Sequence, residues 1–224
     1  MTLEDNAIVI QPDTPACASV IWLHGLGADG NDFVSIVEAL DLPADHGIRF
    51  IFPHAPVMPV SLNGGMHMRA WYDIIGIGED FPEDEAGISR SQQHVDSLID
   101  GEVKKGVGSD KIIIAGFSQG GSMALHAGLR YSTPLAGVLC MSGYLSMRQS
   151  LADQMSPSQK HTPVMMMHGL NDTVVDVSLG KHSCKYLQKE GLNLSWIEYP
   201  MEHTVCQSQL EDIRQFISNC LIKA

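Results

Sequence analysis

A serine flanked by glycines, in the run Gly116-Phe-Ser-Gln-Gly120, is the part of the chain best suited to covalent chemistry. The β-branched apolar run Lys111–Ala115 precedes it and predicts a buried strand, and the small, apolar stretch Gln119–Arg130 predicts a helix. This pattern at a sharp strand-to-helix turn is typical of a nucleophile elbow, which holds the serine hydroxyl above a sheet. We therefore predict that Ser118 is a catalytic nucleophile. A structural glycine-rich turn is the alternative.

A serine hydroxyl reacts only when a base removes its proton, and the base needs a carboxylate to orient it. With an elbow of this kind, the partners follow in the order Ser, Asp, His along the chain. The expected strand Pro163–Met167 runs into a turn that holds Asp172, and His203 follows the expected strand Leu194–Tyr199. We predict Asp172 as the acid and His203 as the base, with Asp176 as the rival acid.

Attack of a serine on an ester creates an oxyanion, which backbone N–H groups must stabilise. One expected donor is Gln119, the residue after the nucleophile. The expected strand Ser19–Leu23 leads into His24-Gly-Leu-Gly27, whose glycines allow an amide to turn inward. Leu26 is therefore the second predicted donor, with Gly25 as the runner-up and a simple turn as the remaining interpretation.

The composition is that of an acidic globular protein. The chain has 224 residues, of which 44% are hydrophobic and 18% charged, and this fits a single domain over residues 1–224. Its net charge of −12 argues against nucleic acid as a partner and against electrostatic adhesion to anionic lipid. The net charge does not exclude acyl substrates, because these are held by apolar surface.

The chain has no recognisable signal for export or for metal binding. Its first residues are acidic, and no apolar run approaches the roughly 18 residues that suggest a membrane span. The five cysteines are scattered, which is typical of free thiols in a reducing compartment, so we expect a cytoplasmic location. Histidines and cysteines do not show metal-ligand spacing, so no metal is expected.

Strand-like and helix-like stretches alternate along the chain, which predicts an α/β fold with a mostly parallel sheet covered on both faces. The expected strands are Ala7–Ile10, Ser19–Leu23, Arg49–Phe52, Lys111–Ala115, Leu135–Met141, Pro163–Met167 and Leu194–Tyr199. The expected helices are Asn31–Leu40, Ala86–Lys105, Gln119–Arg130, Val177–Lys189 and Val205–Ile222. Residues 57–85 have no clear period, and a long loop within a compact domain is usually functional, so we expect them to bind substrate.

Taken together, these motifs resemble the phospholipase/carboxylesterase family, which includes acyl-protein thioesterases and small bacterial carboxylesterases. The similar segments are Leu23-His-Gly-Leu-Gly-Ala-Asp-Gly-Asn-Asp-Phe33, Phe52-Pro-His-Ala-Pro56, Met68-Arg-Ala-Trp-Tyr-Asp73, Gly116-Phe-Ser-Gln-Gly-Gly121 and the turns around Asp172 and His203. The resemblance implies an α/β-hydrolase fold, a Ser118–Asp172–His203 triad, an oxyanion hole from Leu26 and Gln119, and no cofactor. Some family members form dimers, so a homodimer is a candidate assembly.

The resemblance also implies a substrate-binding role for Trp71, which matches a family motif beside the active site. The chain departs from the family at Met201-Glu202, before His203, where relatives more often have a small residue. Between flexible glycines, Ile74, Ile75, Ile77 and Phe81 form an apolar segment. We expect these four side chains to bind substrate, either as a mobile flap over an acyl chain that contacts lipid transiently, or folded down as a satellite core.

The sequence therefore predicts a serine hydrolase that cleaves carboxylic acyl esters through an acyl-enzyme. The first hypothesis is a carboxylesterase with a broad acyl-ester range, and the alternative is an acyl-protein thioesterase or lysophospholipase for long acyl chains. A hydrolase fold retained as a non-catalytic binding protein is a remote third. Because a histidine base must be neutral, we expect activity to rise with pH through about 6–7, where an unperturbed imidazole loses its proton.

Overall fold

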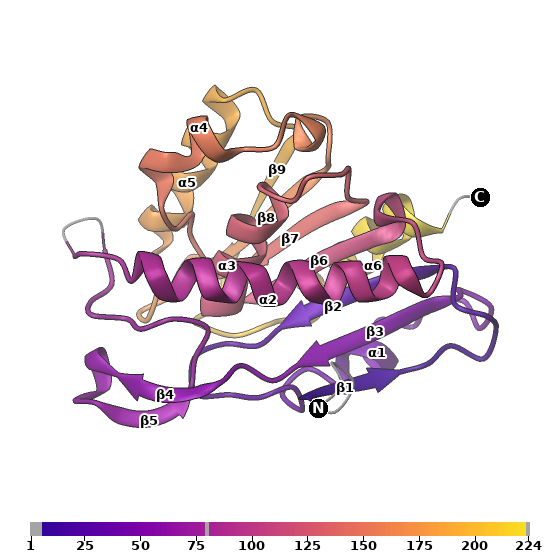
Figure 1. Ribbon diagram of the computed structural model, residues 1–224, viewed down its shortest axis with the longest axis horizontal. Helices are drawn as coiled ribbons and strands as arrows, with labels where there is room; N and C mark the ends of the chain where they lie inside the picture. Colours follow the sequence, from indigo (N-terminus) through magenta and orange to yellow (C-terminus); the bar gives the residue numbers. More distant parts are fainter. Residues whose placement is uncertain (1–5, 79–80, 223–224) are drawn as a thin grey trace.

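The computed structural model describes residues 6–78 and 81–222, and its centre is a seven-stranded sheet. The strand order is β1-β3-β2-β6-β7-β8-β9, and every neighbouring pair is parallel except β1 with β3 (Figure 1). The strands are β1 (Ala7–Ile10), β2 (Ala18–Leu23), β3 (Ile48–Pro53), β6 (Ile112–Phe117), β7 (Gly137–Met141), β8 (Val164–Gly169) and β9 (Leu194–Tyr199). This is the α/β-hydrolase fold that the sequence predicted.

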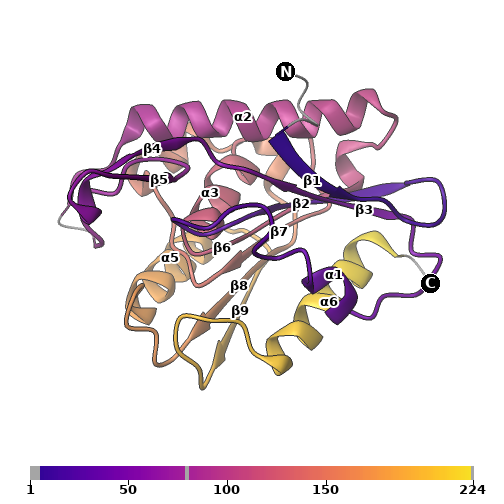
Figure 2. The same ribbon diagram turned by 90° about the horizontal axis from the view of Figure 1, so that it is seen from below.

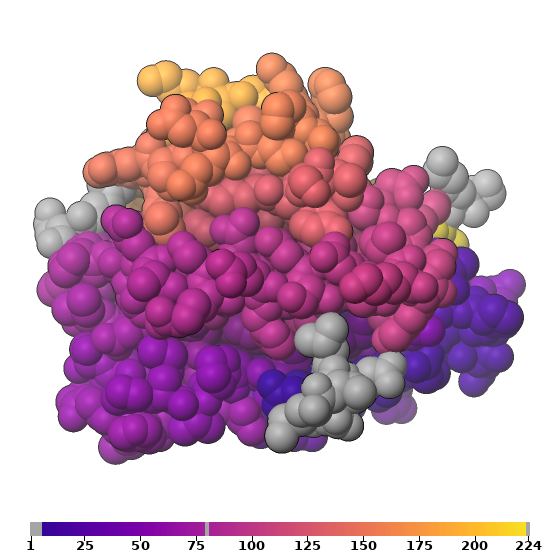
Figure 3. Space-filling view, in the orientation of Figure 1, coloured from indigo at the N-terminus to yellow at the C-terminus, as the bar shows by residue number. Residues whose placement is uncertain are grey.

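Helices cover both faces of the sheet, as Figure 2 shows. The helices are α1 (Ile36–Ala39), α2 (Glu85–Lys104), α3 (Gln119–Gly128), α4 (Leu151–Gln154), α5 (Val177–Lys189) and α6 (Gln207–Leu221), with short 3₁₀ turns at Ser61–Asn63, Ser109–Lys111, Arg148–Ser150 and Pro157–Gln159. The core on one face contains side chains from α2, α3, α4 and α5, and the core on the other contains side chains from α1 and α6. On the face shown in Figure 3, α2 forms the outer layer. No helix among the described residues is long and apolar enough to cross a membrane.

The central strands are buried on both faces because their side chains alternate between the two cores. In β2, Val20 and Trp22 pack in the core beside α1 and α6, whereas Ile21 and Leu23 pack in the core beside α2 and α3. Such strands have no solvent-exposed face, and this explains the largely apolar runs in the sequence. Because β2, β6, β7, β8 and β9 are mutually parallel, their carboxyl ends meet at one edge of the sheet.

Two predicted elements differ from the structure. The helix expected over Asn31–Leu40 is mostly turns, and only α1 is helical. The Asp29 side chain accepts a hydrogen bond from the N–H of Asn31 at 2.7 Å, and such a local bond competes with helix formation. The second difference lies in residues 57–85, which contain an antiparallel hairpin of β4 (Val57–Val60) and β5 (Met66–Arg69). The hairpin lies near the end of the sheet to which β2 and β3 point (Figure 1).

Candidate active site

Ser118 lies in a sharp turn between β6 and α3, with backbone angles φ 55° and ψ −120° that few non-glycine residues adopt. The flanking glycines are required by close backbone contacts. A Cβ on Gly120 would lie 2.2 Å from the carbonyl oxygen of Leu23, and one on Gly116 would lie 2.2 Å from the carbonyl oxygen of Gly120. The N–H of Ser118 donates to the carbonyl of Met141 at 2.8 Å and ties the turn to β7. The structure thus has the geometry of a nucleophile elbow.

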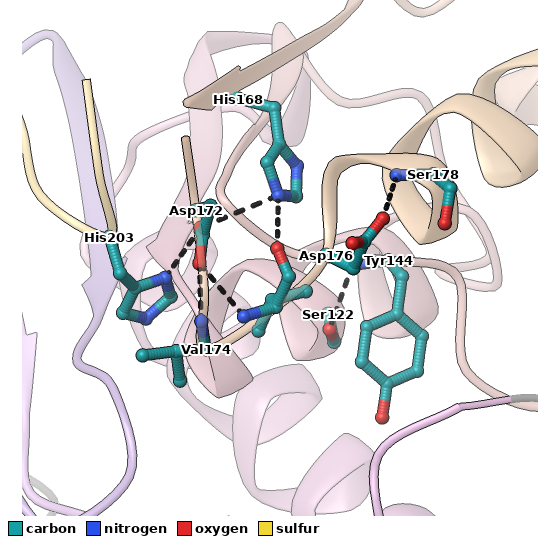
Figure 4. A network of polar contacts seen from close by, with 9 residues as sticks. Ser122, Tyr144, His168, Asp172, Val174, Asp176, Ser178 and His203 are labelled. Carbon is teal, nitrogen blue, oxygen red and sulfur yellow. Dashed lines mark hydrogen bonds and ion pairs between the residues drawn. The ribbon is translucent and has the colours of Figure 1, made fainter. Parts of the chain in front are cut away.

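An acid–base pair lies beside this elbow. Nδ1 of His203 is 2.7 Å from Oδ2 of Asp172, whose side chain is fully buried (Figure 4). The other carboxylate oxygen, Oδ1, accepts hydrogen bonds from the N–H groups of Val174 at 2.9 Å and Val175 at 2.8 Å. A buried carboxylate held in this way can orient an imidazole and stabilise its cation.

The rival acid, Asp176, lies apart from this pair. Its side chain accepts from the N–H of Ser178 at 2.8 Å and caps the N-terminus of α5 (Figure 4). Hydrogen bonds from the side chain and from the N–H of Ser178 lower the pKa of Asp176, as is usual for a capping carboxylate. The structure therefore brings Asp172, and not Asp176, to His203.

Ser118, His203 and both predicted oxyanion donors line one cavity of about 320 Å³. Much of its remaining lining is apolar. The lining residues are Gly25, Leu26, Ala28, Asp32, Leu62, Asn63, Tyr72, Ile74, Ile77, Phe117, Ser118, Gln119, Tyr144, Val174, Val175 and His203. The arrangement places a nucleophile, a base and an apolar surface around a single space, which is what an acyl substrate requires.

The N–H groups of the two predicted oxyanion donors have no partner within the part of the protein that the structure describes. Among the described residues, neither the N–H of Leu26 nor that of Gln119 has a protein acceptor, whereas the N–H of Gly27 is bound to the carbonyl of Arg69 at 2.9 Å. The N–H of Gln119 is at the first turn of α3, where the positive end of the helix favours a developing negative charge. Both N–H groups are therefore without a partner in the described part of the chain, on residues that line the same cavity as Ser118.

His24 holds the loop that carries Leu26. Its Nδ1 is 2.7 Å from the carbonyl oxygen of Gly25, and its Nε2 accepts from the N–H of Ala55 at 3.0 Å. A carbonyl can only accept, so Nδ1 carries the proton and the imidazole is neutral. Burial lowers the pKa of His24, which favours this neutral form.

Trp71, which the resemblance implied to bind substrate, is buried and is not among the residues that line the cavity. Its indole Nε1 donates to the carbonyl of His24 at 2.9 Å, and its backbone N–H donates to Oε1 of Gln119 at 2.9 Å. The Gln119 side chain also donates to the carbonyl of Tyr72 at 2.8 Å. Trp71 therefore supports the two oxyanion segments from the inside.

The four apolar residues of the 74–81 segment divide between two environments. Ile74 is buried in the core and lines the cavity together with Ile77. Ile75 is 46% exposed and Phe81 is 48% exposed. The flap expectation also falls partly on residues 79–80, which lie outside the described residues. The satellite-core alternative thus fits Ile74 and Ile77, and only Ile75 and Phe81 present apolar surface.

Sequence reasoning missed Tyr144, which lines both the catalytic cavity and a second cavity of about 480 Å³. The backbone around it is fixed, because its N–H donates to Oγ of Ser122 at 3.1 Å and the N–H of Leu145 donates to Oγ of Ser183 at 2.9 Å. Burial raises the pKa of Tyr144 to about 12, so its hydroxyl stays protonated at neutral pH. Its place directly after β7, at the same edge as Ser118, was the one signal available.

An α/β-hydrolase fold with an elbow serine and a buried aspartate paired with a histidine defines the class of protein. The model of the Phospholipase/Carboxylesterase family matches residues 4–221, and the chain belongs to that family of carboxylic ester hydrolases. It is similar to acyl-protein thioesterase 1 of Gibberella zeae, with 38% identity over 209 residues and 89% of each chain covered. It is also similar to acyl-protein thioesterase 1 of Schizosaccharomyces pombe, with 39% identity over 202 residues, 90% of this chain and 89% of the relative.

The fold comparison agrees with the sequence comparison. The crystal structure of acyl-protein thioesterase 2 from Zea mays matches with a TM-score of 0.85 and 27% identity, covering 96% of this chain and 98% of that one. The crystal structure of the Bacillus cereus carboxylesterase matches with a TM-score of 0.78 at 16% identity, covering 96% of this chain and 93% of that one, which shows the shared fold.

Proposed function

We propose that this protein hydrolyses carboxylic acyl esters through a covalent acyl-enzyme on Ser118, with His203 as the base and Asp172 as its orienting acid. The observation that carries the proposal is the 2.7 Å contact between His203 and a buried Asp172 in the turn beside Ser118, with Ser118 and His203 lining one cavity. Because Nδ1 of His203 donates its proton to Asp172, Nε2 is left with a free lone pair that can accept a proton.

Each step uses one part of this arrangement. Ser118 Oγ attacks the acyl carbonyl while His203 takes its proton, and the N–H groups of Leu26 and Gln119 stabilise the oxyanion that forms. Collapse of the tetrahedral intermediate breaks the bond to the leaving alcohol or thiol, which receives the proton from His203. Water then attacks the acyl-enzyme by the same route, giving the carboxylic acid and free Ser118.

The cavity supports an acyl group as the recognised part of the substrate. Leu26, Leu62, Ile74 and Ile77 provide apolar surface close to the reacting atoms. A broad-range carboxylesterase is the first candidate. The names of the relatives favour the second, an acyl-protein thioesterase, and a lysophospholipase is a third form of the same chemistry.

Three further parts of the proposal concern the surroundings of the enzyme. Transient contact with lipid is assigned to the exposed side chains of Ile75 and Phe81, and a homodimer remains a candidate assembly. The five free cysteines support a cytoplasmic location.

The test is kcat/KM on p-nitrophenyl esters from acetate to palmitate, with Ser118→Ala as the active-site variant. Ser97→Ala, which removes an exposed hydroxyl on α2, is the matched control. We expect turnover by the wild-type and control proteins, a loss of activity in Ser118→Ala, and covalent labelling of Ser118 by a fluorophosphonate probe. A preference for short chains favours the carboxylesterase, and a preference for long chains leads to S-acyl peptides and lysophospholipids. A folded protein that neither turns over any ester nor reacts with the probe would be a non-catalytic binding protein.

A further inference from the structure

A second histidine, His168, lies against the same carboxylate as His203. It is the last residue but one of β8, and its side chain is completely buried. Its Nε2 is 2.8 Å from the carbonyl oxygen of Val175 and 3.5 Å from Oδ2 of Asp172 (Figure 4). Because both neighbours can only accept, Nε2 of His168 must carry a proton.

This contact closes a small ring of hydrogen bonds around the acid. The N–H of Val175 donates to Oδ1 of Asp172, and the carbonyl of Val175 accepts from His168. Val175 is therefore fixed on both sides of its backbone. Without the N–H of His168, the buried carbonyl of Val175 would lose its partner, and the turn that holds Asp172 would lose one of its hydrogen bonds.

The other ring nitrogen of His168, Nδ1, lies in surroundings that disfavour a second proton. Nδ1 is buried without a hydrogen-bond partner among the described residues, and a Cβ on Gly180 of α5 would lie 2.6 Å from it. The indole of Trp196 lies beside the ring, with centroids 5.9 Å apart. A proton on Nδ1 would thus be buried with no acceptor, which is costly.

The charged and titratable groups near His168 act in both directions. Burial lowers the pKa of His168 most, and the positive form of His203 would lower it further. The hydrogen bond to the carbonyl of Val175 and the carboxylates of Asp172 and Asp176 oppose that effect, but the net shift is downward. Two histidines thus share one carboxylate in different environments, since His203 is partly exposed in the cavity and His168 is sealed.

We propose that His168 is a positioning residue for the catalytic acid: locked as the neutral Nε2–H tautomer, it holds the Val175 turn and so aims Asp172 at His203. Gly180 is also required for this arrangement, because only a residue without a side chain leaves room for the imidazole of His168. The inference rests on the proposed function. It assigns different roles to the two histidines: His203 exchanges protons during turnover, and His168 does not.

The first test reads the tautomer directly and does not depend on activity. Two-bond ¹H–¹⁵N correlation spectra of the ¹⁵N-labelled protein distinguish the Nε2–H, Nδ1–H and doubly protonated forms of each histidine. The signal of His168 is assigned by its absence in His168→Gln. We expect the neutral Nε2–H pattern throughout the range from about pH 5 to 8, in which an ordinary histidine titrates. An Nδ1–H pattern, or a titration of His168 within that range, would overturn the proposal.

The second test separates a positioning role from simple packing. His168→Leu keeps apolar volume but has no donor, whereas the side-chain amide in His168→Gln can still donate to the carbonyl of Val175. We expect the leucine variant to lose about 10- to 100-fold in kcat with KM unchanged, because a misaimed acid affects the reaction and not substrate binding. The glutamine variant should recover most of that loss. A folded leucine variant with wild-type kcat, or a glutamine variant as slow as the leucine variant, would refute the inference.

A third variant guards against a leucine variant that does not fold. Gly180→Ala leaves His168 in place but brings a methyl group against Nδ1, so we expect a lower kcat and a shifted His168 signal. Lys185→Ala, on the exposed side of α5, is the matched control and should change neither. Unchanged kcat in Gly180→Ala would contradict the role of Gly180. If the wild-type protein cleaves no ester and does not react with the probe, the proposed function fails, while the tautomer measurement still decides the state of His168.

Discussion

Replacing Asp172 by Asn tests the reasoning about the site most directly, because the structure dictates which way the new amide must face. Oδ1 of Asp172 accepts two backbone N–H groups, at 2.9 and 2.8 Å, so the amide oxygen must take that position. The amide NH₂ is then forced into the position of Oδ2, 2.7 Å from Nδ1 of His203. The reverse orientation would set the NH₂ against two donors and lose both hydrogen bonds.

A hydrogen-bond donor at that position reverses the tautomer of His203. Nδ1 of His203 must then accept, so the proton moves to Nε2, which can no longer take the proton of Ser118. Removing the acid in this way costs a serine hydrolase triad about 10⁴-fold in kcat, which corresponds to about 5 kcal/mol of transition-state stabilisation. The Nε2–H of His168, 3.5 Å from Oδ2, would also face a donor and adds to the penalty.

The assay is kcat for a soluble p-nitrophenyl ester near neutral pH, with thermal unfolding to show that each variant is folded. Asp176→Asn is the matched control, because Asp176 caps α5 and has no contact with His203. We expect Asp172→Asn to lose nearly all activity and Asp176→Asn to keep it. The reasoning is refuted if folded Asp172→Asn loses less than about tenfold, or if Asp176→Asn is the variant that fails.

Three further predictions concern stability and specificity. Ser118→Gly should be about 1 kcal/mol more stable than Ser118→Ala in urea unfolding, because glycine relieves the positive φ; equal stability would argue against strain at the elbow. Tyr144→Ala should raise kcat/KM for bulky esters relative to acetate by joining the cavities of about 320 and 480 Å³, whereas Tyr144→Phe should not. Burial lowers the pKa of His126 to about 4, below its unfolded value, so the free energy of unfolding should fall as the pH drops from about 6.5 to 4. The fall should be up to about 3 kcal/mol larger in the wild type than in His126→Gln, and an equal fall would contradict the shift.

Much of the fold follows from the sequence because its elements are bounded by strong local signals. Leu194–Tyr199 and Val177–Lys189 were predicted with the bounds that the structure has. The first contains Leu, Trp, Ile and Tyr and stops before Pro200, and the second ends shortly before Gly191. The helix predicted over Asn31–Leu40 is helical only at Ile36–Ala39, and its first residues follow a turn held by the Asp29 side chain.

The triad residues of the candidate site could be predicted from the sequence, whereas the lining of the cavity could not. The order and spacing of Ser118, Asp172 and His203 follow from the ends of parallel strands, which topology places together. The lining of the cavity does not follow from topology. Whether the indole of Trp71 points into the cavity or away from it depends on partners such as His24 and Gln119, which lie 47 and 48 residues away in the sequence. A pattern of residue types contains no information about such an orientation.

The alignment of acid and base depends on backbone contact as much as on side chains. Gly169, at the end of β8, leads into the segment of Asp172, and Met201 leads from β9 into the segment of His203. A Cβ on Gly169 would lie 2.5 Å from the carbonyl oxygen of Met201, and the N–H of Asn171 donates to that same oxygen at 3.0 Å. The two segments are therefore in contact through their backbones, in addition to the contact between their side chains. Any side chain at position 169 would push the acid and base segments apart, so this glycine is required by the pairing of the catalytic groups and not by its own backbone conformation.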